Sequence, residues 1–177
     1  MTSANYETGL ATSDDIPAIV AMQEVNLHEN GGGLSVRQTA DWFRRTMAEM
    51  PIVVARRDGV VVGYALATSI AAKSHVGIVQ TMLRAFPAPP NCYLYGPVCV
   101  TESERGNGLA AMMYQEMRKR LPGRTAMSFV RFDNIPSIRA NRKMGKIELG
   151  EFIHDAESYI VFAFTSCRKA QIPTSRQ

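Results

Sequence analysis

The chain has 177 residues, of which 46% are hydrophobic and 20% are charged, and its formal net charge is +4. This composition is typical of a single globular domain that is long enough to bury a full core. The sequence contains no run of five or six Lys or Arg residues and no apolar stretch near the ~20 residues that span a bilayer. Nucleic acid and membrane are therefore not expected as partners.

The cysteines and histidines are spread along the chain without a redox or metal-binding pattern. Cys92, Cys99 and Cys167 have no CxxC spacing, and the first two lie in or beside apolar runs, where small buried thiols are expected. The N-terminal residues do not have the pattern of a signal peptide. We therefore expect a cytoplasmic protein with reduced thiols and no bound metal.

The first half of the chain predicts a strand, two helices and a β-hairpin. These elements occupy residues 6–12, 13–25, 35–50 and 52–66. Pro17 is expected in the first turn of the first helix, and Gly31–Gly33 separates the two helices. Asp58–Gly59 predicts a tight turn between the hairpin strands, because both residue types tolerate positive φ.

The second half begins with an ambiguous segment, 69–90, in which 76–86 fits either a helix or an extended segment with a loop. The pattern then predicts strands over 93–100, 127–132, 147–153 and 158–164, helices over 109–121 and 137–144, and a loose tail over 168–177. Gly96–Pro97 interrupts the first of these strands. A bulge or a sheet edge is expected there, because proline lacks the N–H that a ladder needs.

The six residues Arg105–Ala110 lie between the apolar run Val98–Val100 and the helix that begins at Leu109. A glycine-rich loop in this position points backbone N–H groups and the positive end of a helix dipole at one spot, which suits a diphosphate. The loop also matches GxGxxA, the dinucleotide fingerprint, but residues 101–105 separate it from the strand and only 66 residues follow Ala111. A plain turn before a core helix is the remaining alternative.

Further residues make the pattern more specific. Arg105, Gly108 and Ala110 follow R-x-x-G-x-A, and Asn134–Ile138 and Lys143–Gly145 follow downstream at a suitable distance. With these motifs the chain resembles the GCN5-related N-acetyltransferase (GNAT) superfamily over nearly its whole length. The resemblance implies an α/β (α+β) fold with a mixed, mostly antiparallel sheet of about six or seven strands and helices on both faces. It implies a single domain over 6–165, followed by a polar tail over 166–177.

The resemblance implies acetyl-CoA as co-substrate and assigns its binding residues. The diphosphate would rest on the loop N–H groups, and the pantetheine arm would pair with the preceding strand, where the two central strands separate. An asparagine from the facing element would hydrogen-bond the arm. The residues concerned are Val98, Cys99, Val100, Arg105, Gly106, Asn107, Gly108, Leu109, Ala110, Asn134 and Ser137.

The implied reaction is direct attack of an amine on the thioester, and here the sequence departs from the family. Members of the family often carry a tyrosine, acting as general acid, seven residues after the asparagine, whereas this chain has Asn141 at that position. A phenylalanine is common after the late glycine, whereas this chain has Lys146 there. An amide is no acid at neutral pH, although it can hydrogen-bond sulfur. Tyr93 and Tyr95 flank the expected separation of the strands, either as core aromatics or as a base. Tyr95 and Asn141 are therefore the catalytic candidates.

Other candidate bases are Glu24, His28, Glu29, Glu102 and His154. Two functions from different classes fit the sequence. The first is an N-acetyltransferase acting on a primary amine, and the second is an acetyl-CoA sensor with little or no catalysis, which the missing tyrosine favours. The acceptor amine is not identified by the sequence, and a homodimer formed through the last strands is left open.

Overall fold

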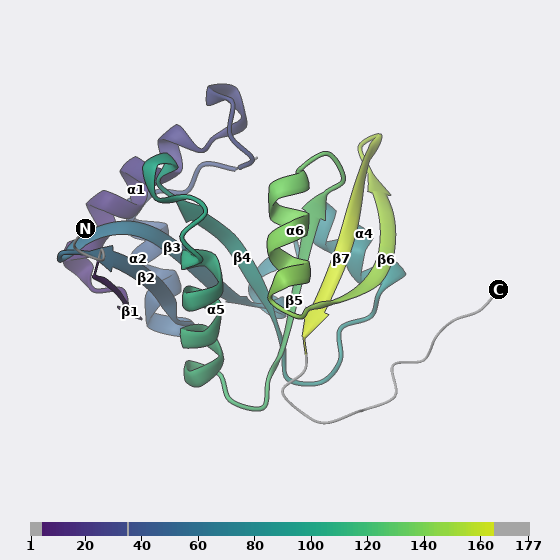
Figure 1. Ribbon diagram of the computed structural model, residues 1–177. Helices are drawn as coiled ribbons and strands as arrows, with labels where there is room; N and C mark the ends of the chain where they lie inside the picture. Colours follow the sequence, from purple (N-terminus) through teal and green to yellow (C-terminus); the bar gives the residue numbers. More distant parts are fainter. Residues whose placement is uncertain (1–4, 35, 165–177) are drawn as a thin grey trace.

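The computed structural model describes residues 5–34 and 36–164 (Figure 1). Its centre is a seven-stranded sheet in the order β1-β2-β3-β4-β5-β7-β6. The strands are β1 (Tyr6–Leu10), β2 (Ile52–Arg57), β3 (Val60–Ser69), β4 (Cys92–Val100), β5 (Thr125–Arg131), β6 (Ile147–His154) and β7 (Glu157–Phe164). All neighbouring strands are antiparallel except β4 and β5. The expected mixed, mostly antiparallel sheet is thus confirmed.

Helices cover both faces of the sheet. They are α1 (Ile16–Val25), α2 (Ala40–Glu49), α3 (Ile70–Lys73), α4 (Gly77–Ala85), α5 (Leu109–Arg120) and α6 (Ile135–Lys143). Figure 1 shows α5 and α6 in front of the sheet, with β4 and β5 diverging behind them. The expected stripe is buried against β2, β3 and β4: Leu109, Met113 and Met117 lie on α5, and Leu121 directly follows its end. The buried side chains of α1, α2 and α4 pack on the opposite face.

The start of α2 differs from the prediction. The helix begins at Ala40, whereas the sequence pattern placed its start at Ser35, which lies outside the described residues. The Gln23 side chain donates to the Gln38 carbonyl (2.8 Å) and accepts from the Gln38 N–H (2.8 Å). These two bonds hold the backbone of Gln38 outside a helix, and Thr39 then caps α2 by accepting from the Trp42 N–H.

The ambiguous segment contains α3 and α4, so the helical alternative for 76–86 is correct. Val79 and Met82 of α4 are buried against the part of the sheet formed by β5, β6 and β7. Cys92 and Cys99 are buried free thiols, as expected, while Cys167 and the predicted tail lie outside the described residues. No helix in the described ranges has both the length and the apolarity that crossing a membrane requires.

The two parallel strands, β4 and β5, pair over only three residues each. The last pair is Leu94 with Met127, and beyond it β4 continues with β3 while β5 continues with β7. We call this separation the splay and the Leu94–Met127 pair its vertex. On the β3 side, the register shifts between Ala65 and Ala67, opposite Gly96–Pro97, whose peptide bond is cis. The predicted bulge is therefore present, and the splay opens toward the loops that lead to α5 and α6.

Candidate active site

The glycine loop lies at the wide end of the splay, between β4 and α5. Gly106 and Gly108 have φ values of 86° and 79°, which side chains rarely adopt, and a Cβ on either residue would have no neighbour within 4 Å. Gly108 is the N-cap of α5 and supplies no side-chain cap. Within the described part of the chain, no backbone N–H from Gly106 to Ala110 donates to another residue. This is the arrangement of an anion site built from backbone groups.

A buried carboxylate anchors this loop to the edge of the sheet. Glu104 accepts hydrogen bonds from the Tyr6 hydroxyl (2.5 Å), from Arg57 Nη1 (2.6 Å) and from Asn107 Nδ2 (3.5 Å). These donors, the Tyr6 hydroxyl first among them, lower the pKa of Glu104, so the carboxylate is ionised at neutral pH. Asn107 therefore uses its side chain to fix the loop, and its backbone N–H is the group left for a ligand.

The other side of the splay carries Asn134 and Ser137. The Asn134 side-chain oxygen accepts from the Ser137 N–H (3.2 Å) and so caps α6. Its Nδ2 lies 3.2 Å from the position that a Cβ on Gly33 would take. The structure therefore brings the predicted cofactor residues to the two sides of one opening, with the loop and Val98–Val100 on one side and Asn134 and Ser137 on the other. We call this set of residues the mouth of the splay.

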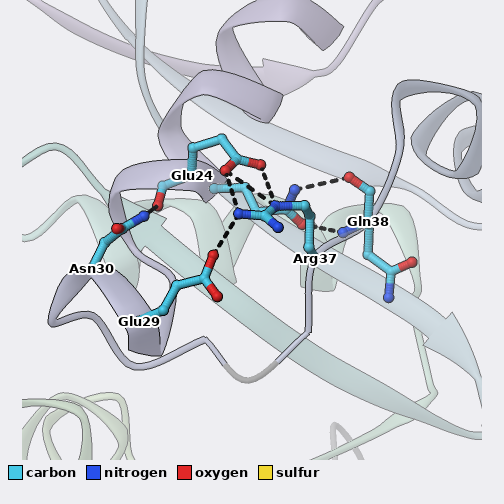
Figure 2. Close-up of polar contacts among 6 residues, drawn as sticks. Glu24, Glu29, Asn30, Arg37 and Gln38 are labelled. Carbon is cyan, nitrogen blue, oxygen red and sulfur yellow. Dashed lines mark hydrogen bonds and ion pairs between the residues drawn. The ribbon is translucent and has the colours of Figure 1, made fainter.

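The segment between α1 and α2 connects the two sides of the mouth. Asn26 accepts a hydrogen bond from Arg105 Nη2 (3.3 Å) at one end, and Gly33 approaches Asn134 at the other. Figure 2 shows how Arg37 holds this segment by binding Glu24 (2.9 Å) and Glu29 (2.6 Å). Next to these ion pairs is a pocket of about 270 Å³, which is lined by Leu27, His28, Glu29, Leu34 and Arg37.

The vertex of the splay carries the two predicted catalytic residues. Tyr95 follows Leu94 directly; its hydroxyl is buried and has no hydrogen-bond partner among the described residues. Burial raises the pKa of Tyr95 well above that of an ordinary phenol, so this geometry does not favour it as a base. Asn141 is buried on α6, where its Oδ1 accepts from Lys146 Nζ (2.8 Å).

Sequence reasoning noted Lys146 only as a departure from the family pattern and gave it no place in the site. Its ammonium group is buried at the vertex together with side chains from four different elements. These are Tyr95, Tyr114, Ser128 and Asn141, and with Lys146 they form what we call the vertex cluster. The available signal was a charged residue directly after Gly145, at a position where an apolar residue is common.

The remaining candidate bases lie elsewhere or have other partners. Glu102 is exposed in the short helix before the glycine loop. His154 lies at the β6–β7 turn, where Nδ1 is 3.1 Å from Thr81 Oγ1 and the ring packs near Gly77 at the start of α4. It therefore lies on the face opposite α5 and α6. Glu24 and Glu29 belong to the ion pairs with Arg37 described above.

Comparison with known proteins identifies the class. Residues 19–145 match the profile of the acetyltransferase (GNAT) family. The same fold occurs in an N-acetyltransferase from Staphylococcus aureus Mu50, with a TM-score of 0.67 and 20% identity over 92% of this chain and 99% of that chain. It also occurs in yncA from Salmonella typhimurium, solved with acetyl-CoA, with a TM-score of 0.69 and 16% identity over 97% and 99% of the two chains. A search of curated proteins gave no match.

The fold and the family profile together define an acyl-CoA-dependent transferase. The protein belongs to the acetyltransferase (GNAT) family, since the profile covers well over half of the chain. It is therefore an acetyltransferase in the general sense of that family.

Proposed function

We propose that the protein transfers an acetyl group from acetyl-CoA to a primary amine by direct attack of the amine on the thioester. The observation that carries this proposal is the row of backbone N–H groups from Gly106 to Ala110 at the mouth of the splay, which donate to none of the described residues. A diphosphate bound there would place the pantetheine arm beside Val98–Val100, between the separated strands β4 and β5.

The burial of the described cysteine thiols favours direct attack by the amine over a route through an acylated enzyme. A cysteine that carries an acyl group must first act as a thiolate. Cys92 and Cys99 are 7% and 4% exposed, and burial raises the pKa of each to about 11. Neither thiol therefore suits a covalent route at neutral pH, which favours transfer from the thioester to the amine in one step.

In the proposed reaction, the amine nitrogen attacks the carbonyl carbon, and the carbon–sulfur bond breaks. The proton that the attacking amine loses passes to water, and the departing sulfur takes up a proton to become the CoA thiol. A backbone N–H of β4 beside the thioester would stabilise the negative charge that develops on its oxygen. The segment around Arg37 and Glu29 would shape the entry of the acceptor, since it lies across the mouth.

The test has two stages. Titration calorimetry with acetyl-CoA measures binding of the donor, and release of CoA thiol is then followed with polyamines, aminoglycosides, amino acids and peptides. We expect release with at least one amine and an equal amount of N-acetylated product by mass spectrometry. Binding without release across the panel would instead support an acetyl-CoA sensor, and failure to bind acetyl-CoA would overturn both functions.

A further inference from the structure

Lys146 is a buried lysine whose side chain turns inward beneath α6. Only 6% of the residue is exposed. Its Nζ is 2.8 Å from Asn141 Oδ1 on α6 and 3.4 Å from Ser128 Oγ on β5. The same atom lies 4.2 Å from the ring centre of Tyr95 on β4 and 4.6 Å from that of Tyr114 on α5. The amino group therefore contacts the four elements that meet at the vertex of the splay.

The position along β4 and β5 indicates what this amino group would face. Tyr95 and Ser128 are the first residues after the last β4–β5 pair, Leu94 with Met127. The five steps along β4 from Val100 back to Tyr95 cover about 17 Å in an extended strand. This distance suits an extended pantetheine arm. An arm that starts at the glycine loop and follows β4 would thus bring its sulfur to the vertex.

The charge of Lys146 is not explained by packing. In the described ranges it makes no ion pair, and the titratable groups that face it are the phenols of Tyr95 on β4 and Tyr114 on α5. The nearby guanidinium of Arg118 on α5 stacks on Phe164 of β7, 4.2 Å from the ring centre. Ser128 on β5 and Asn141 on α6 are neutral. Because an unpaired buried ammonium is costly, stability alone would favour an apolar residue.

Several polar groups of the cluster have hydrogen-bonding capacity that no described residue uses. Asn141 Nδ2 donates one hydrogen bond to the Ser137 carbonyl (2.8 Å), so its second N–H has no described acceptor. The hydroxyls of Tyr95 and Tyr114 are buried and lack partners among the described residues. Burial lowers the pKa of Lys146 to about 7, so both of its protonation states are populated near neutral pH. That is the property of an effective proton donor.

We propose that Lys146 lies against the sulfur of bound acetyl-CoA and is the acid that protonates the leaving thiolate. This proposal rests on the function proposed above. As the amine nitrogen bonds to the carbonyl carbon and the carbon–sulfur bond breaks, the electron pair of that bond goes to sulfur. One proton passes from Lys146 Nζ to sulfur, which gives the CoA thiol and a neutral lysine. Lys146 then regains a proton from solvent, while Asn141 keeps the amino group in place.

The decisive measurement needs no acceptor amine. The ε-carbon of Lys146 is followed by NMR in the lysine-labelled protein as the pH is raised, in the presence of CoA or of desulfo-CoA, which lacks only the sulfur. The Lys146→Met variant identifies the signal. We expect the titration curve with CoA to show a displaced midpoint or a second step as the thiol ionises. Lys73 on α3, whose Nζ lies 4.5 Å from the ring centre of Trp42 on α2, is the internal control and should titrate identically with both ligands.

Kinetics with an amine from the panel provide the second measurement. Lys146→Met should lower kcat by about 100-fold, the usual contribution of a general acid, and leave the KM for acetyl-CoA nearly unchanged. The wild-type profile of kcat against pH should fall above about pH 7, and this fall should be absent in the variant. Lys73→Met should retain the wild-type rate and profile.

The outcomes separate this proposal from the proposed function. Identical Lys146 curves with CoA and desulfo-CoA, when both bind, would overturn the role of Lys146 and leave the acetyl transfer standing. Failure of CoA to bind would overturn both. Different curves without acetylation of any amine would place Lys146 beside the sulfur, but would overturn the proposed transfer and the proton donation with it.

Discussion

The two ends of the splay are built in opposite ways. The mouth uses backbone N–H groups from consecutive residues, Gly106 to Ala110, and the nearest buried charge, Glu104, serves to anchor the loop. The vertex uses side chains from β4, β5, α5 and the end of α6, gathered around the ammonium group of Lys146. In the proposed reaction, the mouth would hold the anionic part of the donor, and the vertex would act on the reacting end.

The mouth and the vertex also differ in how much they destabilise the fold. A row of unpaired N–H groups at an exposed loop costs little, because water satisfies them. A buried ammonium without a counter-charge costs several kcal/mol, because neither water nor a carboxylate compensates its desolvation. Of the two ends of the splay, the vertex is therefore the one that lowers the stability of the fold. Ionisable groups in destabilising environments are common at functional sites.

The largest expected effect concerns the mouth. Gly108→Glu should weaken acetyl-CoA binding by at least about 100-fold, because the side chain would enter the space above the loop and bring a negative charge to an anion site. Titration calorimetry measures the change. Gly59→Glu is the matched control: Gly59 has φ of 81°, close to the 79° of Gly108, and no neighbour within 4 Å, but lies in the β2–β3 turn. Equal affinities in the two variants would show that the loop is not the donor site.

The same contrast explains how much the sequence could predict. The glycine loop of the mouth was predictable because its residues are consecutive, and because glycine spacing and helix patterning are local properties. The vertex cluster was not, because Tyr95, Tyr114, Ser128, Asn141 and Lys146 meet only through the packing of distant elements. The late start of α2 has a similar cause, since a contact between distant glutamines holds the preceding backbone outside the helix.

The second-largest expected effect concerns the stability that is lost by burying the charge of Lys146 at the vertex. Lys146→Met should raise the free energy of unfolding by about 1–3 kcal/mol at pH 7, since it removes a buried charge and keeps most of the packing. The pKa of Lys146 is lowered to about 7 in the folded state, below its value of ~10.4 in an unfolded chain. Between these values the unfolded chain binds more protons, so wild-type stability rises with pH.

The gain from Lys146→Met should therefore be greatest at and below pH 7 and should disappear by about pH 10. Urea denaturation at several pH values measures it. Lys73→Met should give a smaller gain, because Lys73 is only partly buried. A gain that does not depend on pH would mean that Lys146 is not buried as a charged group.

A smaller change tests the link between Asn141 and Lys146. Asn141→Asp would place a carboxylate at the position of Oδ1, 2.8 Å from Nζ, and should raise the pKa of Lys146 by about 1–2 pH units. The NMR titration of Lys146 measures this shift, and the fall of kcat should move to higher pH by the same amount. Asn141→Leu has a similar volume and no charge, and it should not raise the midpoint. If the pKa of Lys146 did not change in Asn141→Asp, the amino group of Lys146 would lie away from residue 141.

The smallest effect concerns the segment that lies across the mouth. Arg37 binds Glu24 and Glu29, and these exposed ion pairs contribute little to global stability (Figure 2). Arg37→Gln should therefore leave the melting temperature nearly unchanged while loosening the segment. We expect the KM for the acceptor amine to rise about two- to threefold, with kcat and the KM for acetyl-CoA unchanged, because the acceptor is proposed to enter beneath this segment.

Arg44→Gln is the matched control for this last change, since it breaks another exposed ion pair, with Asp41 on α2, outside the segment. It should leave all three kinetic constants at their wild-type values. If Arg37→Gln instead raised the KM for acetyl-CoA and left the KM for the acceptor unchanged, the segment would serve the donor. The mouth would then bind acetyl-CoA from three sides, and the acceptor would have to approach the vertex from the face covered by α1, α2 and α4.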